Sequence, residues 1–259
     1  MSPEPNQAPI QAEFARRADS IARLSTFDRE SLTRKFLIRS YGEFDLCYAP
    51  FEYVKYGASV VIVGITPGWS QMRESFEIAQ RQLASGADYE SVLREVDRDV
   101  KFSGGIRRRL VSWPYELGLP ELMQIPTCDV FFGARSELAH TTSVIRYALF
   151  FKRERYSGYK PVRLRDLPFL EESSSSLRSE LQANANAIVV PMGSAVSEVL
   201  ELYIANGTIS REQVRLGFPH ASMGGGANER QLRFQSKRGR WAAQTRDWFR
   251  RTPGATQVH

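Results

Sequence analysis

The stretch at residues 59–71 constrains the possible folds more than any other part of the chain. Four consecutive β-branched residues stand at 60–63, and their stiff side chains favour a β-strand. No polar residue interrupts this run, so we expect both faces of the strand to be buried, as in a parallel sheet covered by helices. Gly64 ends the strand, and Pro67 with Gly68 forms a turn whose bare backbone a ligand can approach. Open α/β sheets bind ligands at such strand ends, although an ordinary strand-to-helix turn has the same pattern.

Other segments supply the remaining elements of an α/β domain. Further strands are expected at 129–133, 187–191 and 214–218. Helices are expected at 11–38 (two helices, the second capped near Ser25 and Thr26), 71–84, 88–97, 194–207 and 228–251, with Ser194 as the cap of the helix at 194–207. The aromatic segment at 41–54 is expected to be packed but irregular. We therefore predict a three-layer α/β/α domain with a mainly parallel central sheet at 41–259, and an N-terminal helical extension at 1–40 that packs on this core.

The composition limits the class of protein. Hydrophobic residues make up 42% of the 259 residues and charged residues 25%, which is typical of a globular protein. No segment approaches the roughly 18 consecutive apolar residues of a membrane helix, and residues 1–11 lack the pattern of a secretory signal, so we expect a cytoplasmic protein. Cys47 and Cys128 are expected to be buried thiols. Two cysteines and three histidines cannot form a four-cysteine cluster site and make a structural zinc site unexpected, and we predict neither a metal nor a cofactor.

The net charge of +6 is unevenly distributed. Residues 211–259 contain ten Lys or Arg and three Asp or Glu, a balance of +7, so residues 1–210 carry −1. A localised positive surface is typical of proteins that bind a polyanion, most often a nucleic acid. A solvated basic helix that binds nothing is the alternative interpretation.

A second loop resembles the loop after the first strand. His220 and Ser222 follow the predicted strand at 214–218, and three glycines stand at 224–226. A lone histidine is most often structural, but glycines leave little side chain to bury it, and their N–H groups can approach a phosphate.

These two loops, with three segments between them, resemble the motifs of the uracil-DNA glycosylase superfamily. Gly64-Ile65-Thr66-Pro67-Gly68 is similar to the first motif, and His220-Ala221-Ser222, with Asn228 and Arg230 downstream, is similar to the late motif. Phe102-Ser103-Gly104, Thr142-Ser143-Val144-Ile145-Arg146 and the segment at 187–195 resemble the intervening motifs in the same order. The resemblance spans roughly residues 58–235 and implies the three-layer α/β/α fold of that superfamily.

The resemblance also implies roles for individual residues. His220 would donate a hydrogen bond to the departing base, and Thr66 would hold the attacking water where several families have Asn or Asp. The base would contact Gly64, Ile65, Trp69, Phe102 and Ser143, with Phe102 as the stacking ring. The flanking phosphates would contact Pro67, Gly68, Ser70, Ser103, Ser222, Gly224, Asn228 and Arg230. If Thr66 does not serve, Glu74, Asp97 or Asp99 is an alternative carboxylate, although solvated helix charges are the simpler interpretation.

The implied activity is that of a monomeric, monofunctional DNA glycosylase that removes uracil or a related deaminated base from DNA in base-excision repair. Ser143 stands where a base-reading asparagine is common, and Ala221 replaces a proline, so strict selectivity for uracil is not implied. Two alternatives remain open. One is a nucleic-acid-binding relative without catalysis, and the other is an N-glycosidase that acts on nucleosides or nucleotides.

Overall fold

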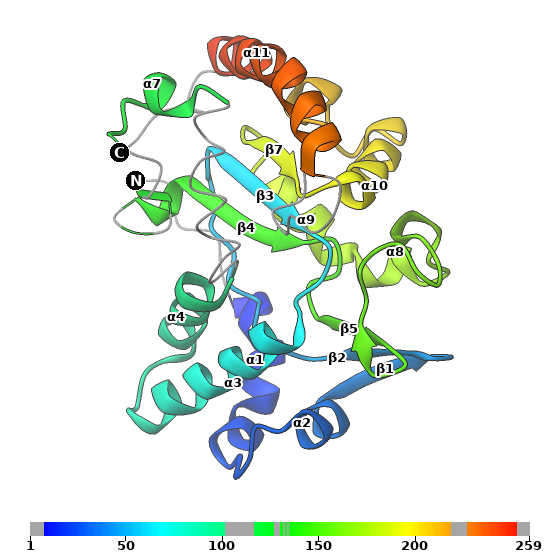
Figure 1. Cartoon of the computed structure of the whole chain (residues 1–259). Helices are drawn as coiled ribbons and strands as arrows, with labels where there is room; N and C mark the ends of the chain where they lie inside the picture. The colour runs from blue at the N-terminus through cyan, green and yellow to red at the C-terminus, as the bar shows by residue number, and fades with distance from the viewer. Residues whose placement is uncertain are drawn as a thin grey trace.

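A parallel sheet of three strands forms the centre of the molecule (Figure 1). The computed structural model describes residues 8–101, 117–126, 130, 131, 133, 135–218 and 227–252, with residues 8–10 and 227–238 described by their backbone alone. The strand order is β4 (Ala139–Ser143), β3 (Val60–Gly64) and β7 (Ile188–Pro191), and Val214 continues it with one parallel bridge to Val189. Because the strands are parallel, Gly64 and Ser143 lie side by side at one edge of the sheet.

Two of the four predicted strands need correction. The strand expected at 129–133 is wrong, since residues 130 and 131 lie in a 3₁₀ turn, and the strand that follows is β4. The strand expected at 214–218 is reduced to the single bridge at Val214. The strands at 60–64 and 188–191 are confirmed.

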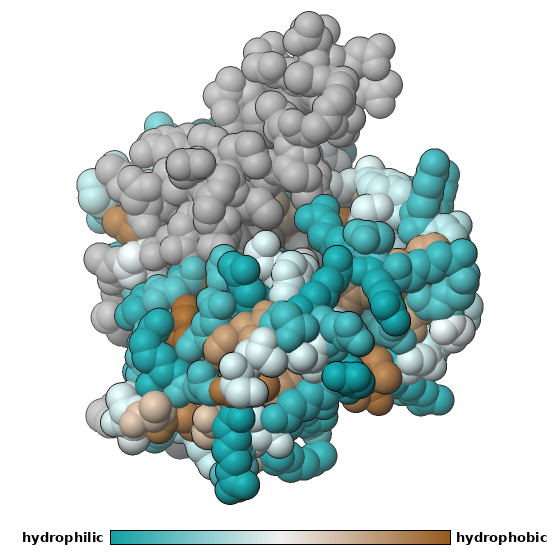
Figure 2. Space-filling view, turned by 60° about the horizontal axis from the view of Figure 1, so that its bottom comes forward, coloured by the Kyte–Doolittle hydropathy of each residue, from teal (hydrophilic) through white to brown (hydrophobic). Residues whose placement is uncertain are grey.

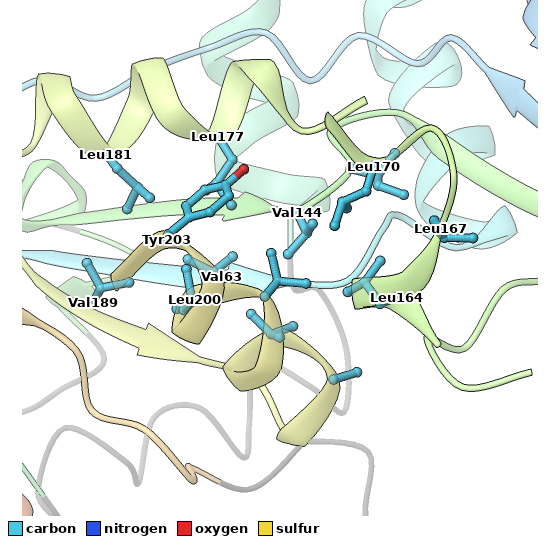
Figure 3. Close-up of a cluster of buried hydrophobic side chains, with 14 of the residues drawn as sticks. Val63, Val144, Leu164, Leu167, Leu170, Leu177, Leu181, Val189, Leu200 and Tyr203 are labelled. Atoms are coloured by element: carbon cyan, nitrogen blue, oxygen red, sulfur yellow. The ribbon is translucent and has the colours of Figure 1, made fainter. Parts of the chain in front are cut away.

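Helices cover both faces of the parallel sheet, as expected for an α/β protein. On β3, Val60 and Ile62 pack against α7 (Leu119–Met123) and α11 (Ala227–Arg251). Val61 and Val63 face the opposite way, toward α9 (Ser175–Ala183) and α10 (Ser194–Ala205). Figure 3 shows side chains of this second cluster, in which α9, α10 and the segment around α8 (Leu170–Ser173) meet the sheet. Gly193, rather than Ser194, occupies the N-cap position of α10.

A second sheet, which the sequence did not predict, is antiparallel. Its order is β1 (Leu37–Tyr41), β2 (Phe44–Cys47), β5 (Ala148–Phe151) and β6 (Glu154–Arg155). The expectations of irregular structure at 41–54 and of helix up to residue 38 are therefore wrong in this part. The alternation of hydrophobic and polar residues explains why β2 forms a strand. Phe44 and Leu46 are buried in the same cluster as α9 and α10, while the side chain of Asp45 between them accepts a hydrogen bond from the Ser40 hydroxyl at 2.6 Å.

The N-terminal helices pack on the other face of this second sheet. Helix α1 (Ala8–Ala22) contacts α3 (Trp69–Ala84) and α4 (Tyr89–Val100), and Phe14 and Ile21 of α1 are fully buried there with Phe150 of β5. Helix α2 (Arg29–Lys35) is capped by Asp28, whose carboxylate accepts from the Ser31 N–H at 2.9 Å, and not by Ser25 or Thr26. The Thr26 hydroxyl supports this cap by donating to the other Asp28 oxygen at 2.9 Å.

The described residues on the face turned toward the viewer in Figure 2 are mostly hydrophilic, with small, separate hydrophobic areas among them. Among the helices that the structure describes, none has both the length and the apolar character needed to cross a bilayer. In the same described part of the chain, no three histidine, cysteine or carboxylate side chains are grouped as metal ligands would be. Cys47 is buried as expected, and Cys128 lies outside the described residues.

Candidate functional site

A pocket of about 60 Å³ opens where β3 and β4 end. The loop after β3 forms one wall, and the end of β4 and the segment around β6 contribute to the others. The residues that line it are Phe51, Gly64, Ile65, Thr66, Pro67, Gln71, Lys101, Thr142, Ser143, Arg146, Arg155 and Tyr156. Three of these described side chains are cationic and none is a carboxylate, so the pocket favours a ligand that presents hydrogen-bond acceptors or negative charge.

Five of the residues predicted from the first motif and its partner segment meet in this pocket. Gly64, Ile65, Thr66 and Pro67 come from the loop after β3, and Ser143 ends β4. Main-chain hydrogen bonds join the two segments, because the carbonyl oxygens of Gly64 and Ile65 accept from residues 144 and 145 at 2.8 and 3.0 Å. The base-contacting positions predicted at Gly64, Ile65 and Ser143 are thus adjacent in space.

Thr66 is held by the backbone of the second sheet. Its hydroxyl donates to the carbonyl oxygen of Tyr147 at 2.7 Å and accepts from the Leu149 N–H at 3.0 Å. A hydroxyl has one proton, and here that proton is already donated. The side chain therefore anchors the loop on β5, and one acceptor lone pair of its oxygen is left for the predicted role of holding water.

The three residues after Pro67 begin helix α3 and do not line the pocket. Gly68 is the N-cap, and its N–H donates to the Gln71 side-chain oxygen at 3.0 Å. The Trp69 ring packs with the cluster around α1, α3 and α4, so its predicted contact with a base in this pocket is not supported. Ser70 is exposed at the start of the helix.

The remaining predicted site residues cannot be placed. Phe102, Ser103, His220, Ser222 and Gly224 lie outside the described residues, and Asn228 and Arg230 stand in the first turn of α11, where only the backbone is described. The chain before the late motif does reach the relevant edge of the sheet, since the carbonyl oxygen of Phe218 accepts from the Gly193 N–H, just after β7, at 3.1 Å.

Helix α11 packs one face on the core and exposes basic side chains. Trp241, Thr245 and Phe249 are buried, whereas Arg240 and Arg246 are exposed. The basic residues of this region are not all free to meet a polyanion. Arg215 is fully buried, and its guanidinium donates to Thr245 Oγ1 at 2.9 Å and to two main-chain carbonyls.

A buried ion pair lies behind the pocket on the side of Lys101. Asp97 of α4 is 4% exposed, and its carboxylate lies 2.8 Å from Lys55 Nζ and 2.9 Å from Lys101 Nζ. Burial alone would raise the pKa of Asp97, but the two lysines outweigh it and the net pKa is lowered. Asp97 is therefore neither a solvated helix charge nor a free carboxylate near the pocket.

A second buried group holds Arg146. Its Nε donates to Glu180 Oε1 of α9 at 3.1 Å, Nη2 donates to the same oxygen, and the other Glu180 oxygen lies 2.8 Å from His140 Nε2. Burial lowers the pKa of His140, which keeps the ring neutral at pH 7. The Lys55 N–H faces Nδ1 at 3.4 Å, so we assign the ring proton to Nε2, from which it is donated to Glu180. Arg146 outweighs the burial of Glu180 and holds the pKa of that carboxyl well below its usual range.

Glu52 is a third buried carboxyl near the same cluster. It is 1% exposed, and the Tyr147 hydroxyl donates to its Oε1 at 3.3 Å. Burial raises the pKa of Glu52 to about 7, and the neighbouring Arg146 guanidinium opposes this only in part. The group next to the pocket-lining Phe51 therefore changes its charge near neutral pH.

Seven of the pocket residues have no role predicted from the sequence. Phe51 belongs to the segment that is expected to be packed but irregular, Gln71 ends the stretch at 59–71, and Thr142 and Arg146 belong to the segment at 142–146 without roles of their own. The other three are Lys101, Arg155 and Tyr156. Arg146 stands three positions after Ser143 in the recognised segment, which is a signal that could have drawn attention to it.

Comparison with known proteins places the chain in a family. It is 33% identical over 208 residues to the uncharacterized protein YoxB of Bacillus subtilis (strain 168), an alignment that covers 80% of each chain. The chain belongs to the same family as YoxB. No protein-family model matches the sequence, and no solved structure matches it.

Proposed function

We propose that this member of the YoxB family is a DNA glycosylase with a uracil-DNA-glycosylase-like fold, which hydrolyses the N-glycosidic bond of uracil or of a related deaminated base. One observation carries the proposal. Residues 64–67 of the first motif line one pocket with Thr142, Ser143 and Arg146 of the segment at 142–146, at the carboxyl edge of a parallel sheet.

The charges of the pocket suit this reaction. When the bond between the sugar carbon and the base nitrogen breaks, the electron pair leaves with the base, which becomes anionic, and water adds to the positive sugar carbon. Positive groups fixed before the reaction stabilise such a leaving anion without reorganisation. Lys101 and Arg146 are fixed in this way, because each is tied to a buried carboxylate behind the pocket.

His220 is proposed as the direct donor to the base. It stands two residues after Phe218, which contacts Gly193 at the carboxyl edge of the sheet. A donor of this kind acts mainly in the transition state, so its loss should reduce turnover more than binding.

One observation favours a second candidate, a nucleic-acid-binding protein of the same fold without catalysis. The Thr66 hydroxyl is committed to β5, so the first motif offers no side chain that would activate water in the way an aspartate does. The two candidates share the same ligand and differ in whether the bond is broken.

A glycosylase assay separates them. Single- and double-stranded oligonucleotides that carry uracil, hypoxanthine or xanthine are incubated with excess protein, and alkali then cleaves any abasic site. We expect strand breaks at one or more of these bases, at a rate that His220→Ala lowers by about 10²- to 10³-fold while DNA binding is retained. Thr66→Ser, which keeps the hydroxyl, is the matched control and should cleave at nearly the wild-type rate. Binding without any cleavage would refute the glycosylase and support the non-catalytic candidate.

A further inference from the structure

Arg146 has hydrogen-bonding capacity that the protein leaves unused. Its Nε and Nη2 both donate to Glu180 Oε1, whereas Nη1 makes no hydrogen bond or ion pair with any other described residue. The side chain is 15% exposed and lines the pocket. A guanidinium carries five N–H donors in one plane, so those not engaged by Glu180 are available to a ligand.

Lys101 differs in this respect. Its Nζ lies 2.9 Å from Asp97 Oδ1, 3.1 Å from the carbonyl oxygen of Thr141 and 3.4 Å from that of Tyr53. An ammonium group has three donors, and three protein oxygens surround this one. Of the two buried cations in the pocket wall, Arg146 is therefore the one suited to make directional bonds to a ligand.

The position of the Arg146 guanidinium is fixed by partners from other elements. Glu180 of α9 engages one edge, and Glu180 is itself engaged by His140 of β4. A guanidinium held in this way loses little freedom when it binds, and it cannot turn away from an unsuitable ligand.

We propose that Arg146 is the residue that selects bases bearing a carbonyl oxygen, such as uracil, hypoxanthine and xanthine, over bases bearing an amino group on the same ring carbon. The proposal rests on the proposed function, of which it specifies the substrate class. Deamination replaces an amino donor with an oxygen acceptor. The N–H groups of Arg146 match that acceptor and oppose the amino groups of cytosine and adenine. No carboxylate among the described residues lines the pocket to accept from an amino group.

The test measures binding separately from cleavage. The probes are single- and double-stranded oligonucleotides with one 2′-fluoro-2′-deoxyuridine or one 2′-fluoro-2′-deoxycytidine, in which the fluorine slows cleavage of the glycosidic bond. Their dissociation constants are measured by fluorescence anisotropy. The wild-type protein should bind the uracil probe about 10- to 100-fold more tightly than the cytosine probe, the range expected for one well-placed pair of hydrogen bonds.

Substitution assigns the preference to Arg146. Arg146→Gln offers both a donor and an acceptor, so the ratio between the two probes should fall to within about threefold of unity, well below the ratio expected with the arginine. Arg155→Met is the matched control: Arg155 is an exposed cation at the same pocket, and its loss should weaken binding of both probes equally. Because Arg146→Gln leaves the buried Glu180 carboxylate without its cationic partner, the double variant Arg146→Gln/Glu180→Gln is measured as well. Circular dichroism verifies that both variants fold.

The outcomes separate this inference from the proposed function. A wild-type ratio near one, no binding of either probe, or a ratio that survives in a folded Arg146→Gln or double variant would overturn the role of Arg146. If the protein cleaves ordinary deoxyuridine but the ratio of the two dissociation constants does not depend on Arg146, the proposed glycosylase activity stands and only the role of Arg146 fails. An Arg146-dependent ratio without cleavage would support the role of Arg146 and refute the glycosylase.

Discussion

Replacing Glu52 with glutamine should change how the stability of the protein depends on pH. Burial raises the pKa of this carboxyl from 4.5 to about 7 in the folded protein. The folded state therefore binds the proton more tightly than the unfolded chain does, so the stabilisation by Glu52 is fully present below about pH 4.5 and is lost as the pH rises through about 7. Since each tenfold change in proton affinity corresponds to about 1.4 kcal/mol, the ionised carboxylate should cost about 3 kcal/mol at pH 8.

Glu52→Gln removes the charge and keeps an oxygen that can accept from the Tyr147 hydroxyl. We expect the variant and the wild-type protein to differ by less than about 1 kcal/mol in free energy of unfolding at pH 5, and the variant to be more stable by about 3 kcal/mol at pH 8. The buried His140 acts in the opposite direction between these values, because a lowered histidine pKa makes the folded state less stable in acid. Its contribution is common to both proteins and disappears from their difference.

Urea unfolding followed by circular dichroism at several pH values measures this difference. Glu43→Gln is the control, since Glu43 is an exposed carboxylate paired with Lys152 on the surface. Its stability curve should run parallel to that of the wild-type protein. Parallel curves for Glu52→Gln as well would show that the Glu52 carboxyl is not isolated from water, and the reasoning would fail.

Three further predictions concern other parts of the molecule. Thr66→Val should lower the free energy of unfolding by about 1–3 kcal/mol, because the Tyr147 carbonyl and the Leu149 N–H lose their partner. Thr66→Ser keeps the hydroxyl and should cost less than about 1 kcal/mol, so equal losses in urea unfolding of the two variants would contradict the prediction. Asp97→Asn should cost about 3–5 kcal/mol in the same assay, because two buried lysines lose their shared carboxylate, whereas Asp99→Asn should stay within about 0.5 kcal/mol. Neutralising Arg240 and Arg246 together should flatten the salt dependence of DNA binding by up to about two units of slope, and an unchanged slope would show that these arginines meet no phosphate.

The strands that could be predicted are those whose side chains face only hydrophobic partners. Residues 60–63 and 188–190 are continuous hydrophobic runs, and each forms a buried strand of the parallel sheet. Strand β4 could not be predicted because its sequence, Ala-His-Thr-Thr-Ser, is mostly polar, although four of its five residues are buried. Its histidine is satisfied by Glu180, forty positions away, and such a partner cannot be recognised before the fold is known.

The candidate site also has a part that could be predicted from the sequence and a part that could not. The loop at 64–67 could be located from the end of a hydrophobic strand followed by glycine and proline, and it does line the pocket. The residues that give the pocket its charge could not be located in this way. The counter-ion of Arg146 is Glu180 of α9, which is 34 positions away in the sequence. Asp97 and Lys101 are only four positions apart and resemble an ordinary solvated helix pair, and their burial with Lys55, which lies before β3, depends on the fold.

The buried carboxylates are better explained by the charge that they maintain in the pocket than by a contribution to the stability of the fold. A buried ion pair rarely stabilises a fold more than well-packed hydrophobic residues of the same volume would, since desolvation offsets the attraction. Asp97 and Glu180 nevertheless stand directly behind the two buried cations of the pocket wall and keep them charged. Without such a partner, a guanidinium would turn toward water, and a buried ammonium would turn toward water or lose its proton. The cluster therefore does for the pocket what a hydrophobic core cannot do, because it holds positive charge at a fixed place beside the ligand.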